Sequence, residues 1–246
     1  MDFTKKNVVV TGGASGIGKA IAAGIVKGGG HAIIVDLNLD AAKAACTELG
    51  NASAYRIDMG DSDNVRTVMA QVLQDLGQVH VLVNNAGIVS TKAFEDVDQA
   101  EWNRAVAINL TGVYTAISAL YPSMKEKGYG RIVNISSVAG KRGGGLLGTS
   151  AYAATKAGVI GLTKAVAREG APHGIACNCV CPSYTLTPMT AIMDEEKTKK
   201  VLSTIPLGRG AQPEEIANMV LFFASDLASF ATGEISDCDG GVTMDG

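Results

Sequence analysis

The chain has 246 residues, of which 24 are Asp or Glu and 21 are Lys or Arg, and its formal net charge at pH 7 is −3. This balance argues against a general nucleic-acid binder, because contacts to phosphates depend on clustered Lys and Arg. A hydrophobic content of 47% excludes a disordered chain, and the longest apolar run, residues 219–224, is far shorter than the roughly 20 residues that span a bilayer. We therefore expect a soluble globular protein whose partner is a small molecule, not a nucleic acid or a membrane.

The amino-terminal segment, MDFTKKNVVV, leads into a predicted strand and shows no apolar leader with a cleavage site of small residues. A cytoplasmic location is therefore expected. The five cysteines have no framework spacing, which agrees with a reducing compartment. Cys177, Cys179 and Cys181 would share one face of a strand, but they form no CxxC pair, and we predict no metal site.

Short runs of β-branched residues alternate along the chain with longer, Ala-rich segments. The predicted strands are residues 7–11, 31–37, 54–59, 79–84, 131–136, 175–180 and 234–238. The predicted helices include residues 16–27, 63–76, 102–125, 151–168 and 213–225. No repeat or Pro-rich linker interrupts this order, so residues 1–246 are expected to form a single domain. The alternation predicts an α/β fold with a doubly wound parallel sheet, whose ligands bind at the carboxyl ends of the strands.

The first predicted strand runs into a glycine-rich turn, TGGASGIG, at residues 11–18, and then into a helix. Glycines at this point let the backbone approach a pyrophosphate, whose charge a helix N-terminus can hold. Asp36 lies 18 residues after Gly18, where a carboxylate can accept hydrogen bonds from the adenosine ribose hydroxyls. The same charge repels a 2′-phosphate, and Ser15 supplies no cation, so NAD is favoured over NADP. The alternative is that Asp36 only caps a turn between strand and helix.

Tyr152 and Lys156 stand in YAATK within a predicted helix, and a separation of four places them on one face. At neutral pH only about one free tyrosine in a thousand is ionised, and a nearby ammonium favours the phenolate form. Such a pair can exchange a proton with a substrate, although the same spacing also occurs on solvated helix surfaces. Three other polar segments follow predicted strands or lie on the next helix, namely NNAG at residues 84–87, Ser137, and Asn109 in AINLTG.

Together these segments resemble the short-chain dehydrogenase/reductase family over essentially the whole chain. The matching pieces are TGGASGIG, Asp36, Asp58, NNAG, Asn109, Ser137, Tyr152 with Lys156, Thr187, and DGG at residues 239–241. The resemblance implies a single Rossmann-type sheet of about seven strands, in the order 3-2-1-4-5-6-7, with helices on both faces. It also implies a homotetramer that pairs the helix at residues 151–168, rich in Ala and Gly, and the helix after Asn109 across twofold axes. The alternative is that the small residues pack only on their own sheet.

The resemblance further implies a role for each matching residue. Tyr152 would exchange a proton with the substrate oxygen, which Ser137 would orient. Lys156 would bind the nicotinamide ribose and lower the pKa of Tyr152, and Asn109 would hold a water that links Lys156 to solvent. Asp58 would contact the adenine, and Thr187 the carboxamide. The expected cofactor-binding residues are Gly12, Ser15, Gly16, Ile17, Gly18, Asp36, Leu37, Asp58, Met59, Asn85, Ala86, Gly87, Tyr152, Lys156, Pro182, Thr185 and Thr187.

Two segments depart from the family pattern. Pro182 is followed by Ser183 where the family usually has Gly, so a side chain is added near the expected nicotinamide ring. The stretch at residues 138–151 is slightly long and contains KRGGG, which is read either as a substrate-facing loop or as a solvated, charged turn. Residues 186–210 are expected to act as a substrate lid. The expected pocket residues are Ser90, Leu146, Leu147, Tyr184, Met189 and Met193.

The sequence thus predicts an NAD-dependent oxidoreductase that interconverts a small secondary alcohol, namely a polyol, sugar or hydroxy acid, and its ketone. One alternative is a 3-oxoacyl-(acyl-carrier-protein) reductase. Asp36 disfavours the NADPH that such enzymes typically use, and His173 stands where they often carry a basic residue. An alternative of another class is a non-catalytic sensor or scaffold that binds a nicotinamide cofactor, but the set of catalytic residues is complete. A Ser-His-Asp hydrolase is excluded, because no GxSxG segment or suitably placed histidine is present.

Overall fold

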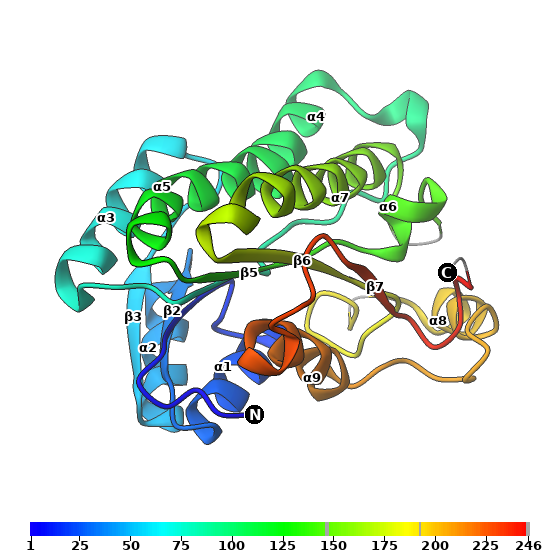
Figure 1. The fold of residues 1–246 in the computed structure, drawn as a ribbon. Coiled ribbons are helices and arrows are strands. Elements are labelled where there is room, and N and C mark those ends of the chain that lie inside the picture. Colours follow the sequence, from blue (N-terminus) through cyan, green and yellow to red (C-terminus); the bar gives the residue numbers. More distant parts are fainter. Residues whose placement is uncertain (146–147, 192, 245–246) are drawn as a thin grey trace.

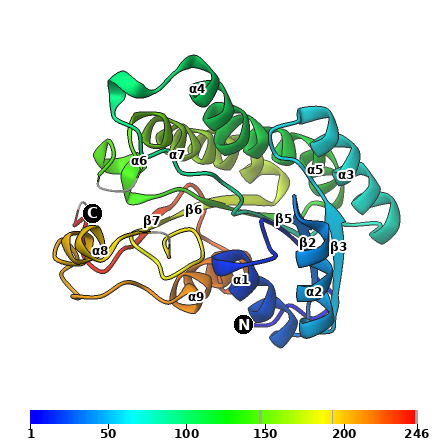
Figure 2. The same cartoon turned by 180° about the vertical axis from the view of Figure 1, so that it is seen from behind.

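The computed structural model describes residues 1–145, 148–191 and 193–244. Within these ranges the chain forms a seven-stranded parallel sheet in the order β3-β2-β1-β4-β5-β6-β7, with helices on both faces (Figures 1 and 2). The strands are β1 (Asn7–Thr11), β2 (His31–Asp36), β3 (Ala52–Arg56), β4 (Val81–Asn84), β5 (Gly130–Ile135), β6 (Ile175–Pro182) and β7 (Ile235–Cys238). The predicted fold class and strand order are confirmed.

Two layers of helices cover the sheet. One layer holds α1 (Gly16–Lys27), α2 (Leu39–Leu49) and α9 (Pro213–Ala224), and the other holds α3 (Ser62–Leu76), α4 (Gln99–Val106), α5 (Gly112–Lys127) and α7 (Ser150–Gly170) (Figure 1). Two helices near the strand ends are α6 (Val138–Arg142) and α8 (Glu195–Leu202). The remaining short turns are η1 (Phe94–Asp96), η3 (Ala171–His173) and η4 (Asp226–Ala228).

Successive buried residues of a strand pack alternately against the two helical layers. In β1, Val8 and Val10 pack with α1 and α9, whereas Val9 packs in the opposite layer. Cys177, Cys179 and Cys181 of β6 all belong to the layer of α5 and α7, so the predicted shared face is confirmed. Apolar residues on both faces explain why these strands read as continuous hydrophobic runs in the sequence.

The helix predicted at residues 102–125 is confirmed, and it lies within a continuous helix at residues 99–127. This helix comprises α4, the π-helical turn η2 (Ala107–Thr111) and α5, and Asn109 lies in the wider turn. Insertions of this kind occur often at functional sites. Residues 99–127 together are long and apolar enough to cross a membrane by composition alone. In the fold, however, Val113, Leu120 and Met124 of this stretch are buried in the core beside the sheet, and this packing accounts for its apolar character.

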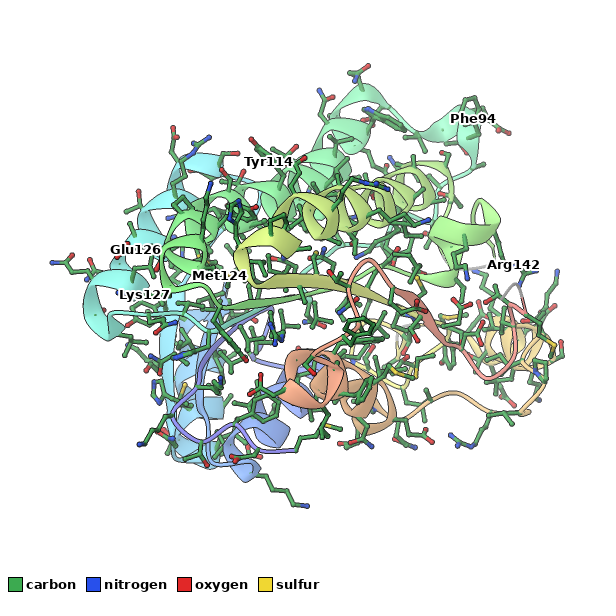
Figure 3. All side chains as sticks on the ribbon, viewed as in Figure 1. Phe94, Tyr114, Met124, Glu126, Lys127 and Arg142 are labelled. Carbon is green, nitrogen blue, oxygen red and sulfur yellow. The ribbon has the colours of Figure 1, made fainter. Side chains whose placement is uncertain are left out.

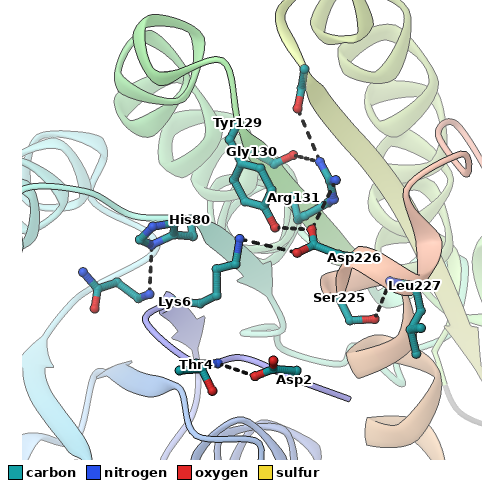
Figure 4. Close-up of polar contacts among 12 residues, drawn as sticks. Asp2, Thr4, Lys6, His80, Tyr129, Gly130, Arg131, Ser225, Asp226 and Leu227 are labelled. Carbon is teal, nitrogen blue, oxygen red and sulfur yellow. Dashed lines mark hydrogen bonds and ion pairs between the residues drawn. The ribbon is translucent and has the colours of Figure 1, made fainter.

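The end of the sheet at which the strands begin carries a separate polar cluster (Figure 4). Lys6 and Arg131 lie over the ring of Tyr129, at 3.8 and 4.6 Å from its centroid, and the Tyr129 hydroxyl donates to Asp226 at 2.8 Å. The ring of His80 packs edge-on against Tyr129 at 6.1 Å. Burial, followed by the charge of Lys6, lowers the pKa of His80. His80 therefore has a structural role at the amino ends of the strands, whereas Ser137 lies at their carboxyl ends.

Candidate active site

A cavity of about 630 Å³ runs along the carboxyl ends of the strands. Its wall contains residues that follow β1, β2, β4, β5 and β6, which is the ligand side of a doubly wound sheet. The predicted site residues that line it are Gly12, Ser15, Gly16, Ile17, Asp36, Leu37, Asp58, Met59, Asn85, Ala86, Gly87, Ser137, Tyr152, Lys156, Pro182, Thr185 and Thr187. Of the predicted set, Gly18 and Asn109 lie behind this wall.

Asn85 holds the glycine-rich turn against the segment after β4. Its side-chain amide donates to the carbonyl oxygens of Thr11, at 3.0 Å, and Gly12, at 3.1 Å. A Cβ atom on Gly18 would collide with the Gly12 carbonyl and would lie 2.6 Å from the Asn85 amide nitrogen. Gly18 therefore allows the close packing that supports the turn from behind.

The start of α1 is open to an anion. Among the described residues, the side chain of the N-cap, Ser15, caps none of the first N–H groups of this helix, and its first turn carries no acid. These groups and the positive end of the helix dipole are available to a pyrophosphate. The glycine cradle is tight, because a Cβ atom on Gly12 would lie 3.0 Å from the Cα atom of Ala86. The residues present therefore fit a dinucleotide.

The carboxylate of Asp36 stands at the rim of the cavity and accepts two backbone hydrogen bonds. Oδ2 accepts from the Ala14 N–H at 3.2 Å, and Oδ1 from the Asn38 N–H at 3.0 Å. Because Asn38 is the N-cap of α2, the alternative role of Asp36 in the turn is present in the structure. Each carboxylate oxygen can accept a further hydrogen bond, so the turn role and the binding of a ribose hydroxyl are compatible.

Ser137, Tyr152 and Lys156 come together in the cavity from two helices. Ser137 is the N-cap of α6, and its hydroxyl accepts from the Ala139 N–H at 3.1 Å. Tyr152 and Lys156 lie on α7, and the Lys156 ammonium is 5.7 Å from the centroid of the Tyr152 ring. Lys156 is 3% exposed and donates to the carbonyl oxygen of Ile135 at 2.8 Å.

Burial sets the ionisation of this pair. It raises the pKa of Tyr152, an effect that the hydrogen bond with Ser137 opposes, and it lowers the pKa of Lys156 to about 8. Desolvation of the phenolate is the largest cause of the raised pKa, and the Lys156 ammonium donates to the Ile135 carbonyl. The lowering of the Tyr152 pKa by Lys156 stays a prediction.

Asn109 is fully buried behind Gly87 and Lys156. Its Oδ1 accepts from the Ile88 N–H at 2.8 Å, and its Nδ2 donates to the Ile88 carbonyl at 2.9 Å and to the Thr155 hydroxyl at 3.2 Å. The side chain thus holds the segment after β4 against α7. The water that Asn109 is expected to hold stays a prediction.

Ser183, the departure from the family pattern, turns its hydroxyl toward the carboxyl-terminal segment. The hydroxyl donates to the Asp239 carbonyl at 2.8 Å. The Asp239 carboxylate in turn accepts from the N–H groups of Gly241, at 2.8 Å, and Thr243, at 2.6 Å. The added side chain therefore ties this wall of the cavity to the DGG segment, which the sequence singled out without a role.

Comparison with known proteins agrees with this geometry. A family model described as enoyl-(acyl carrier protein) reductase matches residues 12–243. A 3-oxoacyl-(acyl-carrier-protein) reductase of Thermotoga maritima is 39% identical over 248 residues, which cover 99% of this chain and 100% of that protein. An acetoacetyl-CoA reductase of Shinella zoogloeoides is 40% identical over 236 residues, which cover 95% of this chain and 96% of that protein. The chain belongs to the short-chain dehydrogenase/reductase family.

A solved structure from Beutenbergia cavernae shares the fold of this dehydrogenase/reductase. It is named for a proposed NAD(P)-dependent gluconate 5-dehydrogenase and holds NADP at low occupancy. The two chains are 34% identical, with a TM-score of 0.91, and the match covers 98% of each. The chain is thus an oxidoreductase of a family whose members act on CH–OH groups.

The substrate end of this dehydrogenase/reductase is less well predicted than the cofactor end. Tyr184 and Met189 line the cavity, but Ser90 and Met193 do not. The Ser90 hydroxyl instead donates to Glu101 of α4. Leu146 and Leu147 lie outside the described residues. The lining residues that the sequence reasoning missed include Arg104, Pro188, Thr190, Val201, Thr204, Ile205 and Val242. Several of these lie within residues 186–210, so this segment covers the cavity, while its closure as a lid stays a prediction.

Proposed function

We propose that this protein is an NAD-dependent oxidoreductase that interconverts a small secondary alcohol and its ketone. The observation that carries the proposal is the shared cavity, in which Ser137, Tyr152 and Lys156 stand at one end and Asp36 at the other. When bound, a nicotinamide cofactor supplies the hydride acceptor or donor. The protein supplies placement, a proton, and a hydrogen bond to the substrate oxygen. A sensor or scaffold would not need this complete set.

Each catalytic residue has a defined task in this proposal. In reduction, the Tyr152 hydroxyl gives its proton to the ketone oxygen, and in oxidation the phenolate accepts the proton of the alcohol. The Ser137 hydroxyl donates a hydrogen bond to the same oxygen. Burial favours the neutral form of Tyr152, which suits proton donation. Lys156, held at the Ile135 carbonyl, brings a positive charge close to the phenol.

The second candidate is reduction of a 3-oxoacyl thioester. It is supported by the names of the Thermotoga maritima and Shinella zoogloeoides relatives. A panel assay decides between the two by following NAD reduction with polyols, sugars and hydroxy acids, and NADH oxidation with acetoacetyl thioesters. We expect turnover with the small alcohols. Turnover with the thioesters alone would replace the first proposal by the second, and turnover with neither class would refute both.

We propose that Asp36 makes NAD(H) the preferred cofactor. The substitution Asp36→Ser is expected to move the preference toward NADP(H) by about tenfold or more, because it removes a like charge beside the 2′-phosphate. Arg56, next to Asp36 in the register of β2 and β3, lines the same rim and can then pair with the phosphate. The measurement is a fluorescence titration of each variant with NADH and NADPH.

The control for this prediction is Asp40→Ser, which removes an acid of α2 that lines the rim next to Asp36 but does not line the cavity. It is expected to leave the preference in place. Tighter binding of NADPH than NADH by the native protein would contradict the assignment of NAD.

We propose that the chain assembles as a homotetramer. Four of the five small residues expected on this face of α7 are exposed, namely Ala154, Ala157, Gly161 and Ala165, so they do not pack on their own sheet. The fifth, Gly158, is half-buried and packs against Leu110 of the same chain. Phe94 of η1 and Tyr114 of α5, 80% and 56% exposed, lie on the same side of the sheet as α7 (Figure 3). Such a face permits close approach of a second copy. Sedimentation at micromolar concentration is expected to show a tetramer, and a monomer would refute this.

A further inference from the structure

The two ends of the cavity differ in charge. The carboxylates in its described lining, Asp36 and Asp58, both belong to the adenosine end. The described lining contains three cationic side chains, Arg104, Arg142 and Lys156, and no carboxylate of the described lining follows Ser137 in the chain. The remaining wall there consists of hydroxyl-bearing and apolar residues, among them Met189. This end of the cavity therefore favours a substrate with negative charge.

Lys156 and Arg142 have different surroundings. The Lys156 ammonium is buried and bonded to the Ile135 carbonyl. Arg142 is exposed to the cavity and makes no hydrogen bond or ion pair with any described residue. Its neighbour Lys141 is engaged with Asp237 at 2.6 Å. Of the two cations that follow Ser137 in the described lining, Arg142 is thus the one whose charge is available to a ligand.

Arg142 lies on the short helix that begins after Ser137. Ser137 is the N-cap of α6, and Arg142 is its last residue, so the two lie about 7.5 Å apart along the helix axis at 1.5 Å per residue. Figure 3 places Arg142 at the end of α6, on the side of the molecule where α8 lies. Gly143, with φ of +82°, ends the helix immediately afterwards. A guanidinium at this place can reach a group a few carbon atoms from the oxygen that Ser137 holds.

We infer that Arg142 binds the carboxylate of the substrate, and that the substrates are short-chain hydroxy acids and the matching oxo acids. This inference rests on the proposed function and narrows it. A guanidinium binds a carboxylate through two parallel hydrogen bonds, which gives both affinity and orientation. A neutral polyol would instead offer this guanidinium no charged partner.

The test compares an acid with its neutral ester, 3-oxobutyrate and methyl 3-oxobutyrate, in NADH oxidation. The native enzyme is expected to prefer the acid in kcat/KM by tenfold or more. Arg142→Gln is expected to lower this preference about 10- to 100-fold, as for the loss of a hydrogen-bonded charge pair, and Arg142→Lys by less. Arg104→Gln is the matched control, because Arg104 also lines the cavity but lies on α4, and it is expected to keep the preference.

Two further outcomes separate this inference from its alternatives. If Arg142→Gln keeps the preference for the acid, the inference is wrong. NADH oxidation by this variant would still support the proposed function. Acetoacetyl-CoA carries its charge on phosphates. A loss in Arg142→Gln confined to this thioester would assign the arginine to phosphate and would also overturn the inference.

A binding measurement makes the test independent of turnover. Butyrate and butyramide have the same chain and lack the reacting oxygen, so they can be titrated calorimetrically into the protein with NADH present. The native protein is expected to bind butyrate at least tenfold more tightly than butyramide, and Arg142→Gln to lose this difference. Equal binding by the native protein would overturn the inference. If butyrate binds more tightly than butyramide but no ketone is turned over, the arginine site is supported and only the proposed function is contradicted.

Discussion

The substitution Tyr152→Phe is expected to lower kcat by about 10²–10⁴-fold in both directions of the reaction, which is the usual contribution of a general acid or base. In the proposed mechanism the removed hydroxyl acts on the substrate oxygen, whereas the ring of residue 152 remains in the wall of the cavity. The dissociation constant for NADH should therefore change by less than about threefold. Steady-state rates and a fluorescence titration of the same preparations measure the two quantities.

A matched control is Tyr121→Phe, which removes a hydroxyl from a tyrosine of α5 outside the cavity. It is expected to retain the native rate. Residual activity above about a tenth in the Tyr152→Phe enzyme would show that the proton is transferred elsewhere, because a general acid or base contributes more than this.

The substitution Lys156→Ala is expected to weaken cofactor binding and to lower kcat/KM for NADH about 10²-fold or more. Lys156 is buried beside Tyr152, so its charge acts in a site of low dielectric constant, where a fixed charge is worth more than in water. A loss confined to kcat, with unchanged binding of NADH, would show that Lys156 does not contact the cofactor. The Ile135 carbonyl to which it donates lies inside the same cavity.

The pH profile provides an independent check on Lys156. Burial lowers the pKa of this lysine to about 8, so its charge is present below that pH and is lost as the pH rises through it. Because kcat/KM for NADH reports ionisations of the free enzyme, reduction is expected to fall above about pH 8. The falling limb should disappear in Lys156→Ala. Its persistence there would assign the ionisation to another group.

Most of the fold and the cofactor end could be predicted because their signals are local. The glycine-rich turn, Asp36 at a strand end, and a tyrosine and lysine four residues apart are each defined over a few residues. The substrate end could not be predicted equally well. Ser90 and Tyr184 both follow predicted strands, yet only Tyr184 lines the cavity, because the Ser90 hydroxyl finds a partner on α4.

The sequence by itself determined the alternation of strands and helices through its periodicity, and the family and the sheet order through the resemblance of its motifs. It also named the candidate catalytic residues. Only the tertiary structure decided how those residues behave. Asn109 lies in a π-helical turn, and its amide pairs with Ile88, 21 residues away. The pKa of Tyr152 is raised because segments distant in sequence bury it. Arg142 belongs to the cavity because α6 and the segment around α8 enclose the same space, and no local pattern encodes that enclosure.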